Sequence, residues 1–147
     1  PAMSLPEPVG GLVIRYAFLW PDEAATGAEE ARKDRPCVIL GVHRPDRQGR
    51  VRIVVVPVTH TPPHDPHTSA GLPVTTARDL GLDVGPHWVR LDIHNRFTWP
   101  GYDLRPVPGA PGRYSYGMLP PDLFNDLRAW TVQLARTGKT SPPIGRD

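Results

Sequence analysis

The chain alternates between apolar runs and polar, proline-rich segments, and the apolar runs have the length of β-strands. Three early runs, 12–20, 36–42 and 50–58, are rich in Val, Ile, Leu and aromatic residues. Runs of this length and composition, bounded by Gly, Pro or polar residues, are typical of strands. Gly49 lies in the polar segment between the second and third runs. This arrangement predicts a hairpin that joins those two strands.

Later parts of the chain carry shorter strand signals separated by long loops. Residues 87–93 alternate in polarity and predict a strand, and 114–117 predict a short one. The segments 59–71 and 95–112 are rich in Pro or Gly and show no periodicity, so both are predicted to be loops. Thr76 is expected to cap a single helical turn.

The final predicted element is an amphipathic helix opened by Pro120-Pro121-Asp122. Proline in the first turn and a carboxylate near the positive end of the helix dipole both favour this start. Gly138 is expected to end the helix. The apolar positions recur at three- and four-residue spacing, at Leu123, Leu127, Trp130 and Leu134.

These elements predict one mainly β domain with a terminal α-helix. The 147 residues and 39 % hydrophobic content suffice for a single core, and the 20 prolines disfavour helices and central strands. A small, strongly bent β-barrel with the helix over one opening satisfies the pattern. The domain is assigned to 11–138, after a tag remnant and N-terminal arm in 1–10 and before a flexible tail in 139–147.

The composition also limits the cellular setting. No apolar run reaches the roughly 20 residues that span a bilayer, so no membrane association is expected. No charged start followed by an apolar segment is present, so no secretory signal is expected. The single cysteine, Cys37, fits a reducing compartment and lies in an apolar strand, where thiols are usually inert. A cytoplasmic location is therefore expected.

The charged residues lean towards a phosphate-containing ligand. The formal net charge of +2 permits nucleic-acid binding without requiring it. Arginine greatly outnumbers lysine, since Lys33 and Lys139 are the only lysines. The guanidinium group binds phosphate through two parallel hydrogen bonds, which an ammonium group does not.

Arg35 and Thr59 are the candidate catalytic residues. If the strands on either side of 43–49 pair as a hairpin, the two residues fall at the same end of it. An arginine can hold a phosphate oxygen and offset charge that develops in the transition state, while a hydroxyl can orient the phosphate. This pair suits cleavage of RNA, where the 2′-OH is an internal nucleophile and no metal ligand is needed. Taken singly, Arg35 could be an edge residue and Thr59 a turn residue.

The order of these motifs resembles the MazF/PemK (Kid) toxins over about 11–138. Arg35-Pro36 precedes an apolar strand, and Val56-Pro57-Val58-Thr59 ends the next one. The segment 88–92 stands where the family has an apolar strand ending in Asp, and 119–123 opens the terminal helix as in the family. The segment 21–34, expected to be a long mobile loop, matches the family's loop beside the RNA site.

The resemblance implies the SH3-like barrel of the PemK/MazF/CcdB-like toxins and a type II toxin–antitoxin function. The toxin would be a homodimer that cuts single-stranded mRNA at specific sequences, without a metal or other cofactor. Cleavage would leave a 2′,3′-cyclic phosphate and a 5′-OH, and would inhibit translation and growth. Arg35 matches the family's catalytic arginine, which is expected to act in acid–base and phosphate-stabilising roles, and Thr59 matches its catalytic Ser/Thr. A cognate antitoxin protein would bind across the RNA groove.

Further residues are expected to bind the RNA substrate. His60 follows Thr59 and is a candidate acid or base near the RNA site. Asp92 matches the family's strand-ending Asp, but Ile93 follows it where many members have Gln. His94 and Asn95 follow this strand and are candidates for base contacts, and the alternative for them is a plain turn. The Trp99 ring is a candidate for stacking on an unpaired base, and the alternative is a role in the core or in a dimer interface.

Other functions are kept open by the sequence alone. His60, His64, Asp65 and His67 carry metal-ligand chemistry, but their spacing within a proline-rich loop matches no zinc pattern, and no metal site is predicted. A toxin of the same fold that poisons DNA gyrase without cutting RNA is one alternative. A non-catalytic SH3-like binding module is another.

Overall fold

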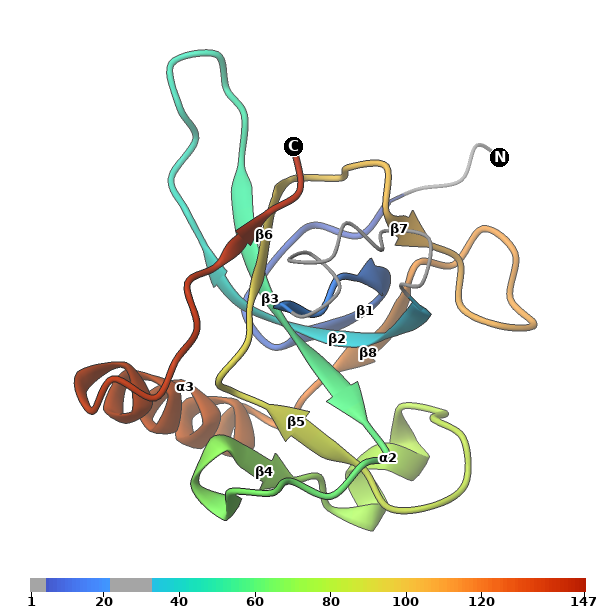
Figure 1. Ribbon diagram of the computed structural model, residues 1–147. Helices are drawn as coiled ribbons and strands as arrows, with labels where there is room; N and C mark the ends of the chain where they lie inside the picture. Colours follow the sequence, from blue (N-terminus) through green and yellow to red (C-terminus); the bar gives the residue numbers. More distant parts are fainter. Residues whose placement is uncertain (1–4, 22–32) are drawn as a thin grey trace.

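Three long strands form the centre of the fold in the computed structural model, which describes residues 5–21 and 33–147. They are β1 (Leu12–Phe18), β2 (Lys33–Val42) and β3 (Arg52–Thr59), paired antiparallel in that order (Figure 1). All three predicted apolar runs are strands, and the hairpin between β2 and β3 is confirmed. β2 begins earlier than its apolar run because its polar start pairs with the end of β1.

Six short strands complete a nine-stranded sheet within the described ranges. β3 pairs with β5 and β6, β1 pairs with β7 and β8, and β4 pairs with β5. The pairs are antiparallel except that β9 runs parallel to β6. The fold is therefore mainly β, and the sheet is not closed in the part of the chain that the structure describes. The short strands are β4 (Ser69–Gly71), β5 (Trp88–Arg90), β6 (Asn95–Thr98), β7 (Leu104–Arg105), β8 (Ser115–Met118) and β9 (Ile144–Gly145).

The segment 95–112 is not the continuous loop that its proline and glycine content predicts. It contains β6, which pairs with β3, and β7, which pairs with β1. Buried Asn95 and Phe97 alternate with the exposed Arg96. This short pattern has the period of a strand but is hidden among turn residues. The strand predicted at 87–93 is correspondingly shorter and ends at Arg90.

Within the described residues, two α-helices and a 3₁₀ turn accompany the sheet: α2 (Val74–Asp79), α3 (Pro121–Arg136) and η2 (Pro66–Thr68). α3 is the predicted amphipathic helix, and its buried residues are Leu127 and Leu134. The chain leaves it through Gly138, whose φ of 72° is a conformation that glycine adopts without strain. α2 starts before Thr76, which is buried in the helix and does not cap it.

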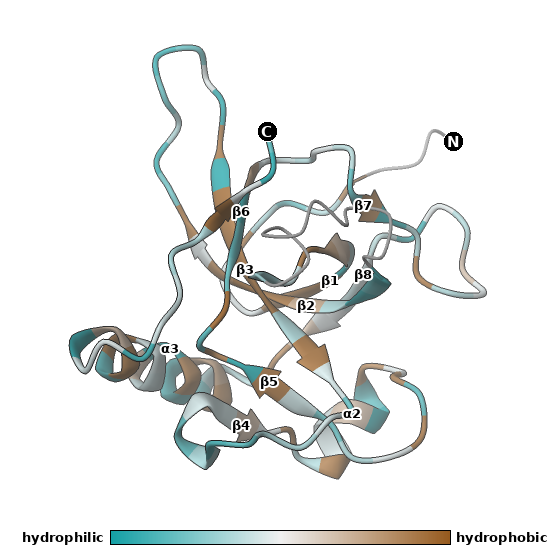
Figure 2. Cartoon of the chain, viewed as in Figure 1, coloured by the Kyte–Doolittle hydropathy of each residue, from teal (hydrophilic) through white to brown (hydrophobic). Residues whose placement is uncertain are grey.

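Two hydrophobic clusters cover opposite faces of the central strands. Val13, Val38 and Val56 belong to the cluster that includes α3. Their neighbours along each strand, exemplified by Ile14 and Ile39, belong to the other cluster. Successive side chains of a strand point to opposite faces, so strands buried on both faces have continuous apolar sequences. Figure 2 shows this hydrophobic centre and the hydrophilic β2–β3 hairpin that projects from it.

The last residues of the chain pack on the sheet, whereas their composition predicts a flexible tail. The backbone N–H of Ile144 donates to the His94 carbonyl at 3.0 Å, within the β9–β6 pairing. The Arg146 side chain is 4 % exposed, donates to the Ala17 carbonyl at 2.8 Å and pairs with Asp103 at 2.9 Å. These partners are far away in sequence, so no local signal in 139–147 reveals them.

Two other expectations concern the loop at 21–34 and membrane-spanning segments. Most of the loop expected at 21–34 lies outside the described residues, and its last two residues belong to β2. In the described ranges, no helix is both long enough and apolar enough to cross a membrane.

Arg146→Ala should lower the free energy of unfolding by about 2 kcal/mol, because it removes the nearer of the two guanidinium groups that pair with the buried Asp103 carboxylate. Urea denaturation measures the change. Arg47→Ala, in the exposed β2–β3 hairpin, is the matched control and should alter stability by less than about 0.5 kcal/mol. Equal stability of the two variants would contradict the docking of the tail.

Candidate active site

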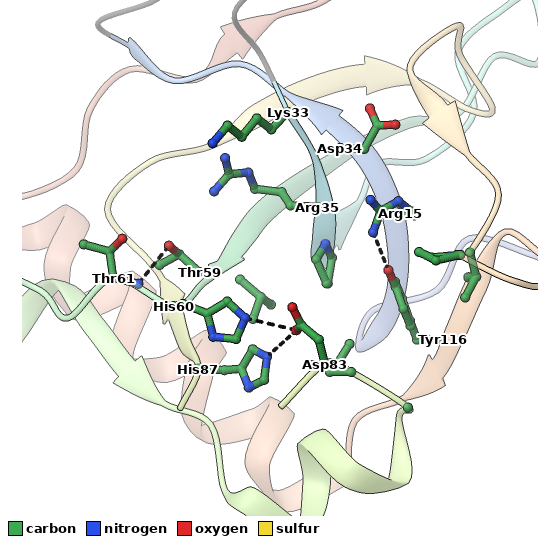
Figure 3. A pocket seen from close by; sticks show the side chains of 16 residues that line it. Arg15, Lys33, Asp34, Arg35, Thr59, His60, Thr61, Asp83, His87 and Tyr116 are labelled. Carbon is green, nitrogen blue, oxygen red and sulfur yellow. Dashed lines mark hydrogen bonds and ion pairs between the residues drawn. The ribbon is translucent and has the colours of Figure 1, made fainter. Parts of the chain in front are cut away.

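A cleft of about 570 Å³ opens where the paired ends of β2 and β3 meet the segment 81–87 (Figure 3). Side chains from six separate parts of the chain line it. β1 contributes Arg15, and β8 contributes Tyr116, whose hydroxyl accepts a hydrogen bond from Arg15 at 2.9 Å. The other polar residues of the lining that carry the argument below are Lys33, Asp34, Arg35, Thr59, His60, Asp83 and His87.

The strand register brings Arg35 and Thr59 together. Cys37 of β2 pairs with Pro57 of β3. In an antiparallel pair, two residues back on β2 correspond to two residues forward on β3, so Arg35 lies beside Thr59. Both side chains line the cleft. The hairpin therefore produces the juxtaposition that the sequence predicts, while the catalytic roles remain predictions.

An aromatic ring orients the Arg35 guanidinium. Its Cζ atom lies 4.6 Å from the ring centroid of Trp20, and Arg90 lies 5.5 Å from the same ring. A cation held against an aromatic face keeps its direction without losing its charge. The Thr59 hydroxyl oxygen accepts the backbone N–H of Thr61 at 3.1 Å, which fixes that side chain at the start of the turn after β3.

Positive charge predominates in the cleft. In the described part of the chain, Arg15, Lys33 and Arg35 line it against the carboxylates of Asp34 and Asp83. The Asp34 carboxylate lies 3.7 Å from the Arg105 guanidinium, which offsets its charge. A concave surface of this kind concentrates anions, and phosphate groups of a single nucleic-acid strand are suitable ligands.

A second polar group in the cleft joins two histidines through one carboxylate. Asp83 Oδ1 lies 3.0 Å from His60 Nε2 and 3.1 Å from His87 Nε2. His60 Nδ1 lies 2.7 Å from the Pro86 carbonyl oxygen. The hydrogen bond with Asp83 is the largest cause of a raised His60 pKa, and hydrogen bonds from His60 and His87 lower the Asp83 pKa.

These three side chains have donor atoms within 4.8 Å of one another, close enough to hold a metal ion. The local chemistry fits a hydrogen-bond network better. A His87 that bound a metal through Nε2 would keep its proton on Nδ1, and that buried atom has no hydrogen-bond partner in the part of the chain that the structure describes. Ligating histidines usually donate this proton to a nearby acceptor.

Of the five residues predicted to bind substrate, His60 is the one that the structure places in the cleft. Asp92 accepts two hydrogen bonds from Arg90, at 2.9 and 2.7 Å. His94 is buried, its Nε2 lies 3.0 Å from the Leu91 carbonyl oxygen, and burial lowers its pKa. Both side chains are committed to neighbours in their own turn.

Asn95 and Trp99 also lie outside the cleft. Asn95 is fully buried, accepts the Leu19 N–H and donates to the Leu19 carbonyl, both at 2.9 Å. It therefore bridges β6 to the end of β1 instead of facing a ligand. Trp99 lines a separate hollow with Tyr16 and Phe97. The sequence places these residues after strands, but their direction depends on pairing that it does not encode locally.

The residues that sequence reasoning missed are Asp83 and His87. They lie 23 and 27 positions after His60 and belong to a different loop. Their four-residue spacing was the one local signal. The sequence predicts no contact of 59–61 with 83–87, because it predicts a loop at 59–71.

Comparisons with protein-family models, with curated proteins and with solved structures gave no match to this chain.

Asn95→Ala should destabilise the fold by about 3 kcal/mol, because it leaves the buried Leu19 N–H and carbonyl without partners. Chemical denaturation measures this, with the exposed helical Asn125→Ala as the control. An unchanged stability combined with lost RNA binding would instead support the base-contact role.

Cys37 should be unreactive in the folded protein. Its thiol is fully buried, and burial raises its pKa well above the usual range. The thiolate is the reactive form. Titration with a thiol-specific chromogenic reagent should detect no reaction until denaturant is added. Rapid modification of the native protein would contradict the buried placement.

Proposed function

We propose that this protein is a MazF/PemK-type toxin, a metal-independent endoribonuclease that cuts single-stranded RNA. The observation that carries the proposal is the placement of Arg35 beside Thr59 in one positively charged cleft. The resemblance of the surrounding motifs supports it. The strongly bent, helix-flanked sheet is proposed to be a variant of the SH3-like barrel of that family.

Arg35 supplies the main interaction with the scissile phosphate. Two of its N–H groups donate to non-bridging oxygens, and its charge offsets the charge that develops as the 2′-oxygen attacks phosphorus. Trp20 holds the guanidinium in place. Thr59 donates its hydroxyl proton to the same phosphate and fixes its orientation. The products are a 2′,3′-cyclic phosphate and a 5′-OH.

The biological setting is proposed from the same resemblance. The toxin acts in the cytoplasm as a homodimer and lowers translation by cutting mRNA. A cognate antitoxin with an acidic, disordered segment suits this cleft, because that segment carries the charge of the RNA it displaces and folds on binding.

The proposal predicts discrete cuts when purified protein is incubated with a long single-stranded RNA in EDTA. Arg35→Ala should lower the cleavage rate by about 10²- to 10³-fold, the usual effect of losing one donor to a developing oxyanion. Thr59→Ala should lower it less. Arg47→Ala, an exposed arginine of the hairpin, should cleave at the wild-type rate, and a 2′-deoxy substitution at the cut site should abolish the product.

Intact RNA from a folded wild-type protein would contradict the proposal. Trapped DNA breaks in the presence of gyrase would then identify the gyrase poison. If the protein neither cuts RNA nor traps DNA breaks, the non-catalytic binding module is the remaining interpretation.

A further inference from the structure

The hydrogen-bond partners of His60 determine its protonation. Nδ1 lies 2.7 Å from the Pro86 carbonyl oxygen, and Nε2 lies 3.0 Å from the Asp83 carboxylate. Carbonyl and carboxylate oxygens only accept hydrogen bonds, so each ring nitrogen must be a donor. A neutral imidazole has a single N–H. The arrangement is therefore complementary to the imidazolium cation.

The hydrogen bonds and burial of His87 indicate that the positive charge of this histidine pair lies on His60. The Nε2 atom of His87 lies 3.1 Å from the same Asp83 oxygen and donates to it. Among the described residues, its buried Nδ1 has no hydrogen-bond partner, which suits a lone pair better than a second N–H. The His87 side chain is 3 % exposed, whereas those of His60 and Asp83 are 46 % and 75 % exposed. His87 forms the buried floor of the network, and charged His60 faces the open cleft.

The network holds this cation next to the proposed phosphate site. His60 directly follows Thr59 and lines the same cleft as Arg35 (Figure 3). Its ring lies 4.3 Å from that of His87, centroid to centroid, which limits rotation. Arg35 and Thr59 provide charge and orientation, but neither readily supplies a proton near neutral pH, since the guanidinium does not deprotonate in proteins.

We propose that His60, kept protonated by Asp83, is the general acid that protonates the leaving 5′-oxygen during RNA cleavage. This inference rests on the proposed function. The 2′-oxygen forms a bond to phosphorus and releases its proton to solvent water. The P–O5′ bond breaks, the His60 Nε2 proton moves to the 5′-oxygen, and His60 regains a proton from solvent. The exposed Asp83 carboxylate yields its place beside Nε2 to the leaving oxygen.

The charged groups around the cleft set the pH range of this step. Asp83 contacts His60 and raises its pKa, so the acid form persists to higher pH than for an ordinary histidine. The His87 ring packs against the His60 ring. Lys33, Asp34 and Arg35 of β2 and Arg15 of β1 line the same cleft, and bound phosphate offsets the cations among them.

The decisive experiment changes the leaving group. Wild type, His60→Gln and Arg35→Ala are compared on an RNA oligonucleotide and on the same oligonucleotide with sulfur in place of the 5′-oxygen. A thiolate leaves without protonation. His60→Gln should lose about 10²- to 10⁴-fold in rate on the oxygen substrate and less than about 10-fold on the sulfur substrate. Arg35→Ala should lose activity on both.

His64→Gln is the matched control, because His64 is an exposed histidine of the loop that follows β3. It should cleave both substrates at the wild-type rate. Circular dichroism melting of each variant establishes that the folded fraction is unchanged at the assay temperature.

Asp83 is a positioning residue, and Asp83→Asn tests it through the pH profile. A general acid is active in its protonated form, so the rate falls as pH rises through its pKa. Loss of the carboxylate lowers that pKa, and the alkaline limb of the profile should move to lower pH. An unmoved limb would contradict the role of Asp83.

The outcomes separate this inference from the proposed function. Absence of cleavage by the wild type defeats both. If the wild type cleaves RNA and His60→Gln loses the same factor in rate on the oxygen and sulfur substrates, the general-acid role of His60 is wrong. The proposed function then stands, and His60 has a structural role. Cleavage that EDTA stops and added Zn²⁺ restores would overturn the general-acid role in favour of a metal held by the same side chains.

Discussion

Antiparallel pairing of β2 with β3 is the constraint on which both the core and the cleft depend. Side chains alternate along each strand, so one register fixes which residues enter which hydrophobic cluster. The same register fixes the partner of Arg35 at the end of the hairpin. A slip of one residue would turn Arg35 to the opposite face and exchange the side chains between the two hydrophobic clusters. The core therefore enforces the geometry of the site.

Long-range hydrogen bonds hold β6 and the last residues of the chain onto this central unit. Asn95 bridges β6 to Leu19, and Arg146 bonds the Ala17 carbonyl and pairs with Asp103. These contacts fix the end of β1, close to Trp20, which packs against the Arg35 guanidinium. Residues with no atom in the cleft thus position its main cation. Asn95 is polar and is predicted to bind RNA, but its buried side chain instead bonds to the backbone of Leu19.

Local pattern in the sequence predicts the elements whose burial is continuous and misses those that depend on distant partners. The apolar runs predict β1, β2 and β3, and the helical spacing of apolar residues predicts α3. The hairpin connection predicts that Arg35 lies near Thr59. β6 and β9 carry weak local signals, because their order comes from pairing with β3 and with each other. His60 was recognised beside Thr59, but Asp83 and His87 join it only through the fold.

We propose that the end of the β2–β3 hairpin is the binding site of a single-stranded RNA. Amide chemical-shift mapping with a non-cleavable, fully 2′-O-methylated oligonucleotide tests it directly. The account predicts salt-sensitive shifts centred on Arg35, Thr59 and His60, with little change at the hollow lined by Trp99. Shifts confined to that hollow, or none at millimolar oligonucleotide, would contradict it.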